Sequence, residues 1–287
     1  MTIVVSGATG NLGRLAVQHL LARGVAASDI VAGGRNASRL AALAEETGVR
    51  TAVFDFTVPA TLDAALAGAE KFVLVSSSEV GQRAAQHQNA IDAAVRAGVR
   101  QLVYTSAPKA TESALILAPE HKATEEAIQA SGVPATVLRN GWYHENYDDS
   151  FRQAADSGVY FASTGAGRVS SAPRTDYAEA IASVLTSEGH VGAVYELSGD
   201  TAWSGDDFAG AVAAATGREV VYRSVEPEQH HAALIEAGLD EGTAGFVVAL
   251  DGNIRDGLLG ETSGELERLI GHPTQPLQAY FAAVTGK

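Results

Sequence analysis

A glycine-rich turn between a short strand and a helix is the feature that most constrains this chain. Residues 2–6 are predicted to be a short buried strand with an apolar, β-branched centre at 3–5, and the turn that follows reads Gly7, Ala8, Thr9, Gly10, Asn11, Leu12, Gly13. Apolar residues then recur at helical spacing as far as Leu20. In such a unit the first glycine permits a tight turn, the second admits a phosphate, and the third brings helix and sheet together. The pattern predicts a dinucleotide site, because free N–H groups at a helix start favour anions. A tight structural turn is the alternative.

Composition narrows the class of protein. The chain has 287 residues, a formal net charge of −14 and no cysteine. No block of like charges suits nucleic acid or an anionic membrane, and no apolar run approaches the length of a membrane span. Disulfides and thiolate metal sites are excluded. Because the first strand begins at residue 2, we expect no targeting segment. The sequence therefore predicts a soluble, cytoplasmic enzyme-sized protein, and it leaves open whether the chain forms a homo-oligomer.

Strand candidates alternate with helical segments through the first half of the chain. Each strand candidate is short and apolar throughout, as expected for strands covered on both faces. They lie at residues 3–5, 30–32, 51–54, 72–75, 102–105 and 135–138. The clearest helices between them lie at 38–47 and 84–97, the latter ending at Gly98. This alternation predicts an α/β fold with a Rossmann-type, doubly wound parallel sheet.

The rhythm changes after residue 138. Residues 140–175 are rich in aromatics, glycine and serine and are predicted to be irregular with one helix. A helix near 176–186 and a strand at 193–197 are expected to return to the main sheet. Helices near 206–216, 228–237 and 263–270, another near the C-terminus, and a strand at 219–222 complete the prediction. We therefore expect a Rossmann domain at 1–139, joined by 174–200, and a smaller, mainly helical substrate-binding subdomain at 140–287.

The end of the second predicted strand indicates which nucleotide binds. An acidic residue there bonds the ribose 2′-hydroxyl of NAD, whereas an arginine accommodates the 2′-phosphate of NADP. The chain reads Gly33-Gly34-Arg35-Asn36, with no acidic residue. Arg35 lies about twenty residues past the last glycine of the loop, close to the expected spacing. The sequence predicts NADPH as the cofactor; a solvated arginine at a strand end is the alternative.

Three strand ends carry polar residues where ligands of an open parallel sheet bind. Ser76, Ser77 and Ser78 follow the fourth strand, where they either contact the cofactor or cap the next helix. Ser106 and Lys109 follow the fifth. The sixth is followed by rings and amides that suit a flat carbonyl substrate, or that simply cover the sheet end: Asn140, Gly141, Trp142, Tyr143, His144, Glu145, Asn146 and Tyr147.

Two absences bear on the chemistry. Reductases that form alcohols commonly use Tyr-x-x-x-Lys, yet no lysine here lies four residues after any of the eight tyrosines. Hydride delivery to a quinone needs a weaker acid, because its product oxygen is phenolic with a pKa of about 10. The histidines do not predict a metal site. His121 and Glu125 lie one turn apart on a predicted helix, where we expect a solvated face, with a proton relay as the alternative.

Several blocks together resemble a known family. They are the glycine loop, Arg35-Asn36, Ser76-Ser77-Ser78-Glu79-Val80-Gly81-Gln82-Arg83, Leu138-Arg139-Asn140-Gly141-Trp142-Tyr143 with Glu145-Asn146-Tyr147, Gly199-Asp200 with Ala202-Trp203, and Leu269-Ile270-Gly271-His272-Pro273. The chain resembles, nearly end to end, the flavin-free NAD(P)H:quinone oxidoreductases of type 2 within the NmrA-like atypical short-chain dehydrogenase/reductases. Triphenylmethane dye reductases resemble the serine and aromatic blocks less well.

The resemblance implies an NADPH-dependent oxidoreductase whose partner is a small-molecule quinone. It implies that Gly7 to Leu12 hold the pyrophosphate, that Arg35 holds the 2′-phosphate, and that Ser76 to Ser78 line the cofactor channel. It places Asn140, Gly141, Trp142, Tyr143, His144 and Glu145 against the nicotinamide, with Ser171 nearby. Tyr143 and Asn146 are the candidates for the catalytic site. Reduction of a dye or enone, and a non-catalytic NADP sensor, remain alternatives. Gly33-Gly34 and His144 depart from the family pattern.

Overall fold

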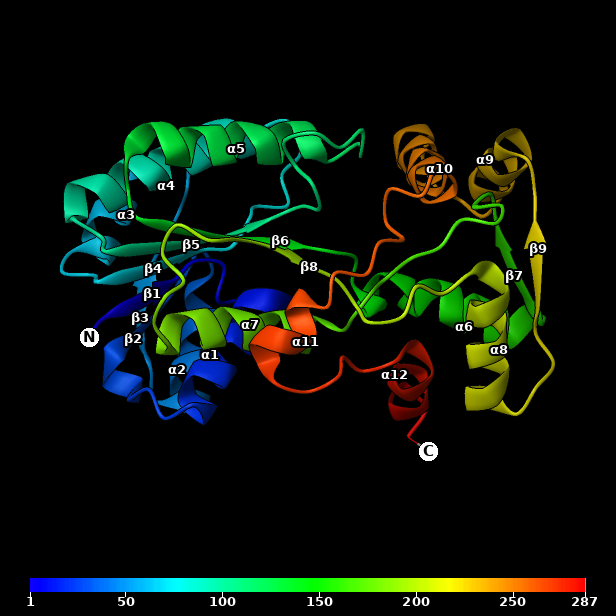
Figure 1. Cartoon of the computed structure of the whole chain (residues 1–287), viewed down its shortest axis with the longest axis horizontal. Coiled ribbons are helices and arrows are strands. Elements are labelled where there is room, and N and C mark those ends of the chain that lie inside the picture. Colours follow the sequence, from blue (N-terminus) through cyan, green and yellow to red (C-terminus); the bar gives the residue numbers. More distant parts are fainter. Residues whose placement is uncertain (287) are drawn as a thin grey trace. The chain divides into compact units, whose positions relative to one another are not determined.

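The computed structural model describes residues 1–286 and divides the chain into two compact units (Figure 1). Unit 1 contains Met1–Thr111, Leu117–Asn140 and Arg174–Leu197. Unit 2 contains Glu112–Ile116, Gly141–Pro173 and the chain from Ser198 onward. The chain thus passes from unit 1 to unit 2 and back before it enters unit 2 for good.

Unit 1 is built on a seven-stranded sheet in the order β3-β2-β1-β4-β5-β6-β8, in which every pairing is parallel. The order reverses between β1 and β4, which creates a switch point of the kind that receives ligands in doubly wound sheets. The predicted fold class is confirmed. The strands are β1 (Ile3–Val5), β2 (Ile30–Gly34), β3 (Arg50–Val53), β4 (Lys71–Leu74), β5 (Gln101–Ser106), β6 (Ala135–Asn140) and β8 (Val194–Leu197).

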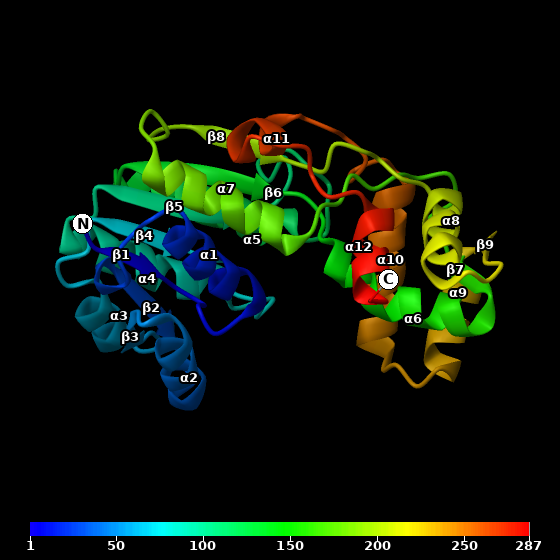
Figure 2. The same cartoon turned by 90° about the horizontal axis from the view of Figure 1, so that it is seen from below.

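Helices cover both faces of this sheet. In Figure 1, α3, α4 and α5 lie on one face and α1, α2 and α7 on the other, and Figure 2 shows α1 beside α7. The apolar strands predicted a core on both faces, and Val4, Phe72 and Leu102 are fully buried. The bounds are α1 (Asn11–Ala22), α2 (Ala37–Thr47), α3 (Pro59–Leu66), α4 (Arg83–Ala97), α5 (Ala118–Ser131) and α7 (Arg174–Thr186), with a 3₁₀ turn, η1 (Ala27–Asp29).

Unit 2 is mainly helical and also contains a two-stranded parallel sheet, β7 (Val159–Ala162) with β9 (Val221–Ser224). Helix α8 packs against both α12 and β9, and α9 packs against α10. The helices are η2 (His144–Tyr147), α6 (Asp148–Ser157), α8 (Gly205–Thr216), α9 (Pro227–Glu236), α10 (Glu241–Arg255), α11 (Glu265–Ile270) and α12 (Leu277–Val284).

Several predicted elements need correction. Residues 140–175 are not irregular apart from one helix, because β7 lies within them and pairs with β9. The expected strand at 219–222 begins and ends two residues later, at Val221–Ser224. The strands expected at 51–54 and 72–75 are each one residue earlier. Helix α10 was not predicted, because three glycines interrupt its apolar pattern. In the structure Asp240 caps the start of this helix, and Asp251 within it pairs with His230 of α9.

Candidate functional site

The glycine loop of unit 1 is built from backbone contacts. Gly7 adopts a left-handed φ of +61°, which glycine tolerates without strain. A Cβ at Gly13 would lie 2.4 Å from the Gly7 carbonyl oxygen, so only glycine lets α1 approach the turn this closely. The Ala8 N–H donates to the Gly33 carbonyl, which ties the loop to β2. The first and third glycines are thus required by the fold itself.

The start of α1 is suited to an anion. Its N-cap is Gly10, which provides no side-chain cap, and its first turn has no acidic residue. Helix N-termini carry unsatisfied N–H donors and a partial positive charge, and here no side chain of the cap position takes them up. These residues fit the pyrophosphate of a dinucleotide.

The end of β2 explains the unusual Gly33-Gly34 pair. A Cβ at Gly33 would lie 3.0 Å from Cβ of Phe54, and one at Gly34 would lie 3.0 Å from the Thr9 side chain. The ring of Phe54 and the glycine loop therefore occupy the space that branched side chains would need. Arg35 follows directly and is well exposed, and its Nη1 lies 2.8 Å from Oε1 of Glu79.

The loop after β4 is held in place by buried groups. The Ser76 N–H donates to Oγ1 of Thr105, and the Ser77 N–H donates to Nε2 of His87. Arg83 donates to the Ser77 carbonyl and pairs with Glu120. The serines do not cap α4, whose N-cap is Gln82 with no side-chain cap. The capping alternative is therefore wrong, and the loop is fixed by its backbone.

Two buried histidines of unit 1, His87 at this loop and His121 on α5, are neutral. Because Nε2 of His87 accepts from an N–H, its proton must sit on Nδ1, which donates to Thr124. Burial lowers the pKa of His87 to about 3, and it does the same to His121. His121 bonds the Tyr104 hydroxyl through Nδ1 at 2.8 Å. The solvated helix face expected for His121 and Glu125 is therefore wrong.

Glu125 belongs to an ion-pair cluster instead. Its two carboxylate oxygens accept from Nε and Nη2 of Arg139, and Oε1 also accepts from Ser106. Arg139 reaches Glu196 of β8 through Nη1 at 2.8 Å. The hydrogen bonding that Arg139 donates to Glu125 is the largest cause that raises the pKa of Arg139. The cluster joins α5, β6 and β8, so these residues are structural ties between elements of unit 1.

Asn140, the first residue of the predicted aromatic block, ends β6 in unit 1, and the rest of the block lies in unit 2, where strand-like contacts organise it. The His144 N–H donates to the Ala172 carbonyl, and the Ala172 N–H donates to the Trp142 carbonyl. Tyr143 is half-buried and Asn146 is exposed, whereas His144 and Tyr147 are buried. The ring of Tyr147 packs edge-on against Trp203 with centroids 4.7 Å apart. The structure thus separates the predicted block into an accessible pair and a buried pair.

Four residues of unit 2 form a hydrogen-bond chain whose proton positions are fixed. Nε2 of His144 lies 2.8 Å from the Gln275 carbonyl, which only accepts, so Nε2 carries the proton. Nδ1 must then accept from the Ser171 hydroxyl at 2.7 Å, and that hydroxyl accepts from Nε1–H of Trp203 at 2.8 Å. Burial lowers the pKa of His144 to about 4, so its imidazole, and with it this hydrogen-bond chain, is neutral at physiological pH.

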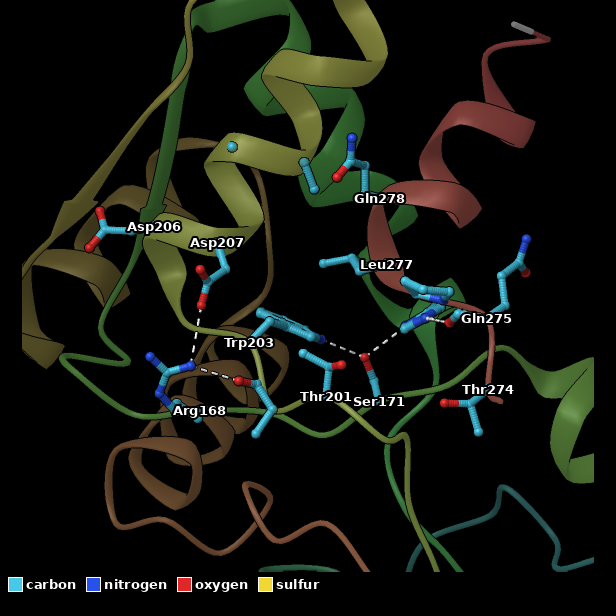
Figure 3. Close-up of a pocket in the computed structure, with 15 residues that line it drawn as sticks. Arg168, Ser171, Thr201, Trp203, Asp206, Asp207, Thr274, Gln275, Leu277 and Gln278 are labelled. Atoms are coloured by element: carbon cyan, nitrogen blue, oxygen red, sulfur yellow. Dashed lines mark hydrogen bonds and ion pairs between the residues drawn. The ribbon is translucent and has the colours of Figure 1, made fainter. Parts of the chain in front are cut away.

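The four residues of this hydrogen-bond chain line a pocket of about 570 Å³ within unit 2 (Figure 3). Helices α8 and α12 contribute Asp207 and Leu277 to it, and Arg168 lies at one side, paired with Asp207. The volume is in the range of small-molecule sites. Sequence reasoning did not single out Arg168 or Gln275, because their partners lie 39 and 131 residues away.

Two absences hold for residues 1–286. No group of three or more His, Asp or Glu side chains there is arranged to hold a metal ion. Over the same residues, every helix is too short or too polar to cross a membrane.

The parallel sheet, the glycine loop and the open start of α1 define a dinucleotide-binding protein of the Rossmann type. The family described as NAD(P)H-binding matches residues 7–188. Quinone oxidoreductase 2 of Escherichia coli (strain K12) is 44% identical over 96% of both chains. The chain belongs to this NAD(P)H-binding family and, within it, to the NmrA-like type 2 quinone oxidoreductases.

Two solved structures share the whole fold. The NADPH-dependent quinone oxidoreductase of Escherichia coli, complexed with NADPH, superposes with a TM-score of 0.94 at 42% identity over 99% of both chains. The Citrobacter sp. triphenylmethane reductase complexed with NADP(H) superposes with a TM-score of 0.93 at 36% identity, over 99% of this chain and all of the other.

Proposed function

We propose that this protein is an NADPH-dependent oxidoreductase that reduces a quinone to a hydroquinone by direct hydride transfer, without a flavin. One combined observation carries the proposal. The start of α1 has no side-chain cap, and the end of β2 presents Arg35 and no acidic residue. Similarity over the whole chain to a quinone oxidoreductase solved with NADPH supports it. A cytoplasmic location and a small-molecule quinone as partner belong to the same proposal.

The residue assignments follow the matched motifs. The backbone of the glycine loop binds the pyrophosphate, and Arg35 binds the 2′-phosphate through its guanidinium. The remaining proposed cofactor contacts are Ser76, Ser77, Ser78, Asn140, Gly141, Trp142, Tyr143, His144, Glu145 and Ser171. The side chains of Ser171 and His144 make their hydrogen bonds within the hydrogen-bond chain of unit 2. We therefore propose that they position the residues after β6.

When bound, NADPH would supply the hydride, and the residues of this chain stabilise the quinone oxygen. The Tyr143 hydroxyl and the Asn146 amide donate hydrogen bonds to the oxygen on which negative charge develops. A phenolic oxygen with a pKa of about 10 needs no strong general acid, so a proton from water completes the hydroquinone. His144 is excluded as the proton donor at neutral pH, because its Nε2 proton is held by the Gln275 carbonyl and burial disfavours the imidazolium.

Steady-state oxidation of NADPH with menadione, compared with a triphenylmethane dye, tests the proposal. We expect turnover with the quinone to exceed turnover with the dye. The alternative of dye reduction is favoured by the superposition on triphenylmethane reductase, and a reversed preference would select it. Tight NADPH binding without turnover of either acceptor would identify a non-catalytic sensor and end the quinone proposal.

A further inference from the structure

The arginine proposed to bind the 2′-phosphate is already paired with a carboxylate. Nη1 of Arg35 lies 2.8 Å from Oε1 of Glu79, and both side chains are exposed at 62% and 41%, so a ligand can reach them. Asp55 lies close enough to interact electrostatically with both groups. Arg35 therefore sits among negative charges, where a 2′-phosphate must compete with them.

Glu79 is held firmly in this position. Its other carboxylate oxygen accepts from Nε2 of Gln86 at 2.7 Å, and Gln86 is buried on α4. The loop that carries Glu79 is tied by the Gly81 N–H to Glu120 and by the Ser77 N–H to His87. Hydrogen bonds from Gln86 and Arg35 lower the pKa of Glu79, so it is ionised at neutral pH. Because Gln86 remains as a partner, Glu79 keeps its place when Arg35 moves.

Glu79 places a carboxylate near the end of β2, where the sequence of β2 itself has no acidic residue. Many dinucleotide-binding sheets carry an acidic residue at the end of the second strand, where it accepts from the ribose 2′-hydroxyl of NAD. Here that strand ends in Gly33-Gly34-Arg35, and the loop after β4 brings a carboxylate to the guanidinium instead. A carboxylate at this point repels a phosphate and accepts from a hydroxyl.

We propose that Glu79 is a second determinant of cofactor preference, which weakens binding of the 2′-phosphate of NADPH and favours the 2′-hydroxyl of NADH. The inference rests on the proposed role of Arg35 and deepens it. Arg35 draws the preference toward NADPH, and Glu79 limits how far that preference extends. The enzyme consequently retains use of NADH.

Calorimetric titration of the full chain with NADPH and with NADH tests this inference. The readout is the ratio of the Kd for NADH to the Kd for NADPH. We expect Glu79→Gln to raise this ratio by about threefold to fivefold, the size expected from an exposed charge pair. The increase should shrink at about 1 M salt, where charges are screened within about 3 Å.

Matched variants separate the causes. Asp63→Asn removes a carboxylate from another exposed ion pair of unit 1, with Arg96 at 2.7 Å, and should leave the ratio unchanged. Arg35→Gln should lower the ratio. If it does not, or if NADPH fails to bind the unmodified protein, the proposed cofactor role of Arg35 fails. If Arg35→Gln lowers the ratio while Glu79→Gln leaves it unchanged, reduces it or weakens both cofactors equally, the inference about Glu79 alone is overturned.

Discussion

The glycine loop of unit 1 and the His144 block of unit 2 are built in different ways. In the loop, backbone atoms make the contacts, and the fold depends on missing side chains at Gly7 and Gly13. In the block, side-chain hydrogen bonds add to the backbone bonds with Ala172, and Trp203, Ser171 and His144 must all be present for the hydrogen-bond chain to close. A site built from backbone atoms is recognisable as a short motif in the sequence, whereas a side-chain network joins residues that lie far apart in the sequence.

Both units contain neutral buried imidazoles, His87 and His121 in unit 1 and His144 in unit 2, and a pH titration probes them together. The folded pKa values of His87 and His121 are about 3 and that of His144 is about 4, all below the ordinary value of 6.5. The unfolded chain therefore binds more protons below pH 6.5, so stability is full above that pH and falls as the pH drops. We expect each histidine to cost about 2 kcal/mol between about pH 7.5 and pH 5. Urea denaturation measures the loss; a flat free energy of unfolding over this interval would contradict the burial of these groups.

Gly13→Ala tests the backbone side of the comparison. The added Cβ meets the backbone of Gly7, which cannot move as a flexible side chain can. We expect a loss of about 2 kcal/mol in stability and a loss of NADPH binding of about a hundredfold or more. Gly245→Ala is the matched control, because that helical glycine of α10 has open space around it and should stabilise the chain by about 0.5–1 kcal/mol. Equal behaviour of the two variants in denaturation and titration would refute the close approach of α1.

Ser171→Ala tests the side-chain region. The substitution leaves Nε1–H of Trp203 and Nδ1 of His144 buried without their shared partner. We expect a loss of about 1–3 kcal/mol in the free energy of unfolding. Ser187→Ala removes an exposed hydroxyl after α7 that bonds the Ser183 carbonyl and His190; because water can replace these bonds, stability should change by less than about 0.5 kcal/mol. Should Ser171→Ala match this control in urea denaturation, the hydrogen-bond chain contributes nothing to stability.

Tyr143→Phe and Asn146→Ala sharpen the division of the block into accessible and buried pairs. Each change removes one proposed donor to the quinone oxygen, so we expect kcat with menadione to fall by about tenfold. The Kd of NADPH should change little. Stopped-flow kinetics and calorimetry measure the two quantities separately. Unchanged kcat in both variants would remove these residues from the substrate site.

The same contrast explains what the sequence predicted. Short apolar strands alternating with helices predicted the parallel sheet, because burial on both faces removes the usual alternation of polar and apolar residues. The pairing of β7 with β9 could not be predicted, since two short strands about sixty residues apart carry no local signal. His121 looked solvated because its burial depends on Tyr104 of a neighbouring strand. The partner of Arg35 was likewise hidden, because Glu79 follows a different strand.

A single-turnover experiment tests the central claim most directly. Protein loaded with NADPH and no added flavin is mixed with excess menadione, and NADPH absorbance is followed by stopped flow. The account predicts one rapid phase that consumes all bound NADPH, with a rate that saturates as menadione increases and slows when the transferred hydrogen of NADPH is replaced by deuterium. Bound NADPH that stays reduced, or oxidation that requires added flavin, would contradict direct hydride transfer to the quinone.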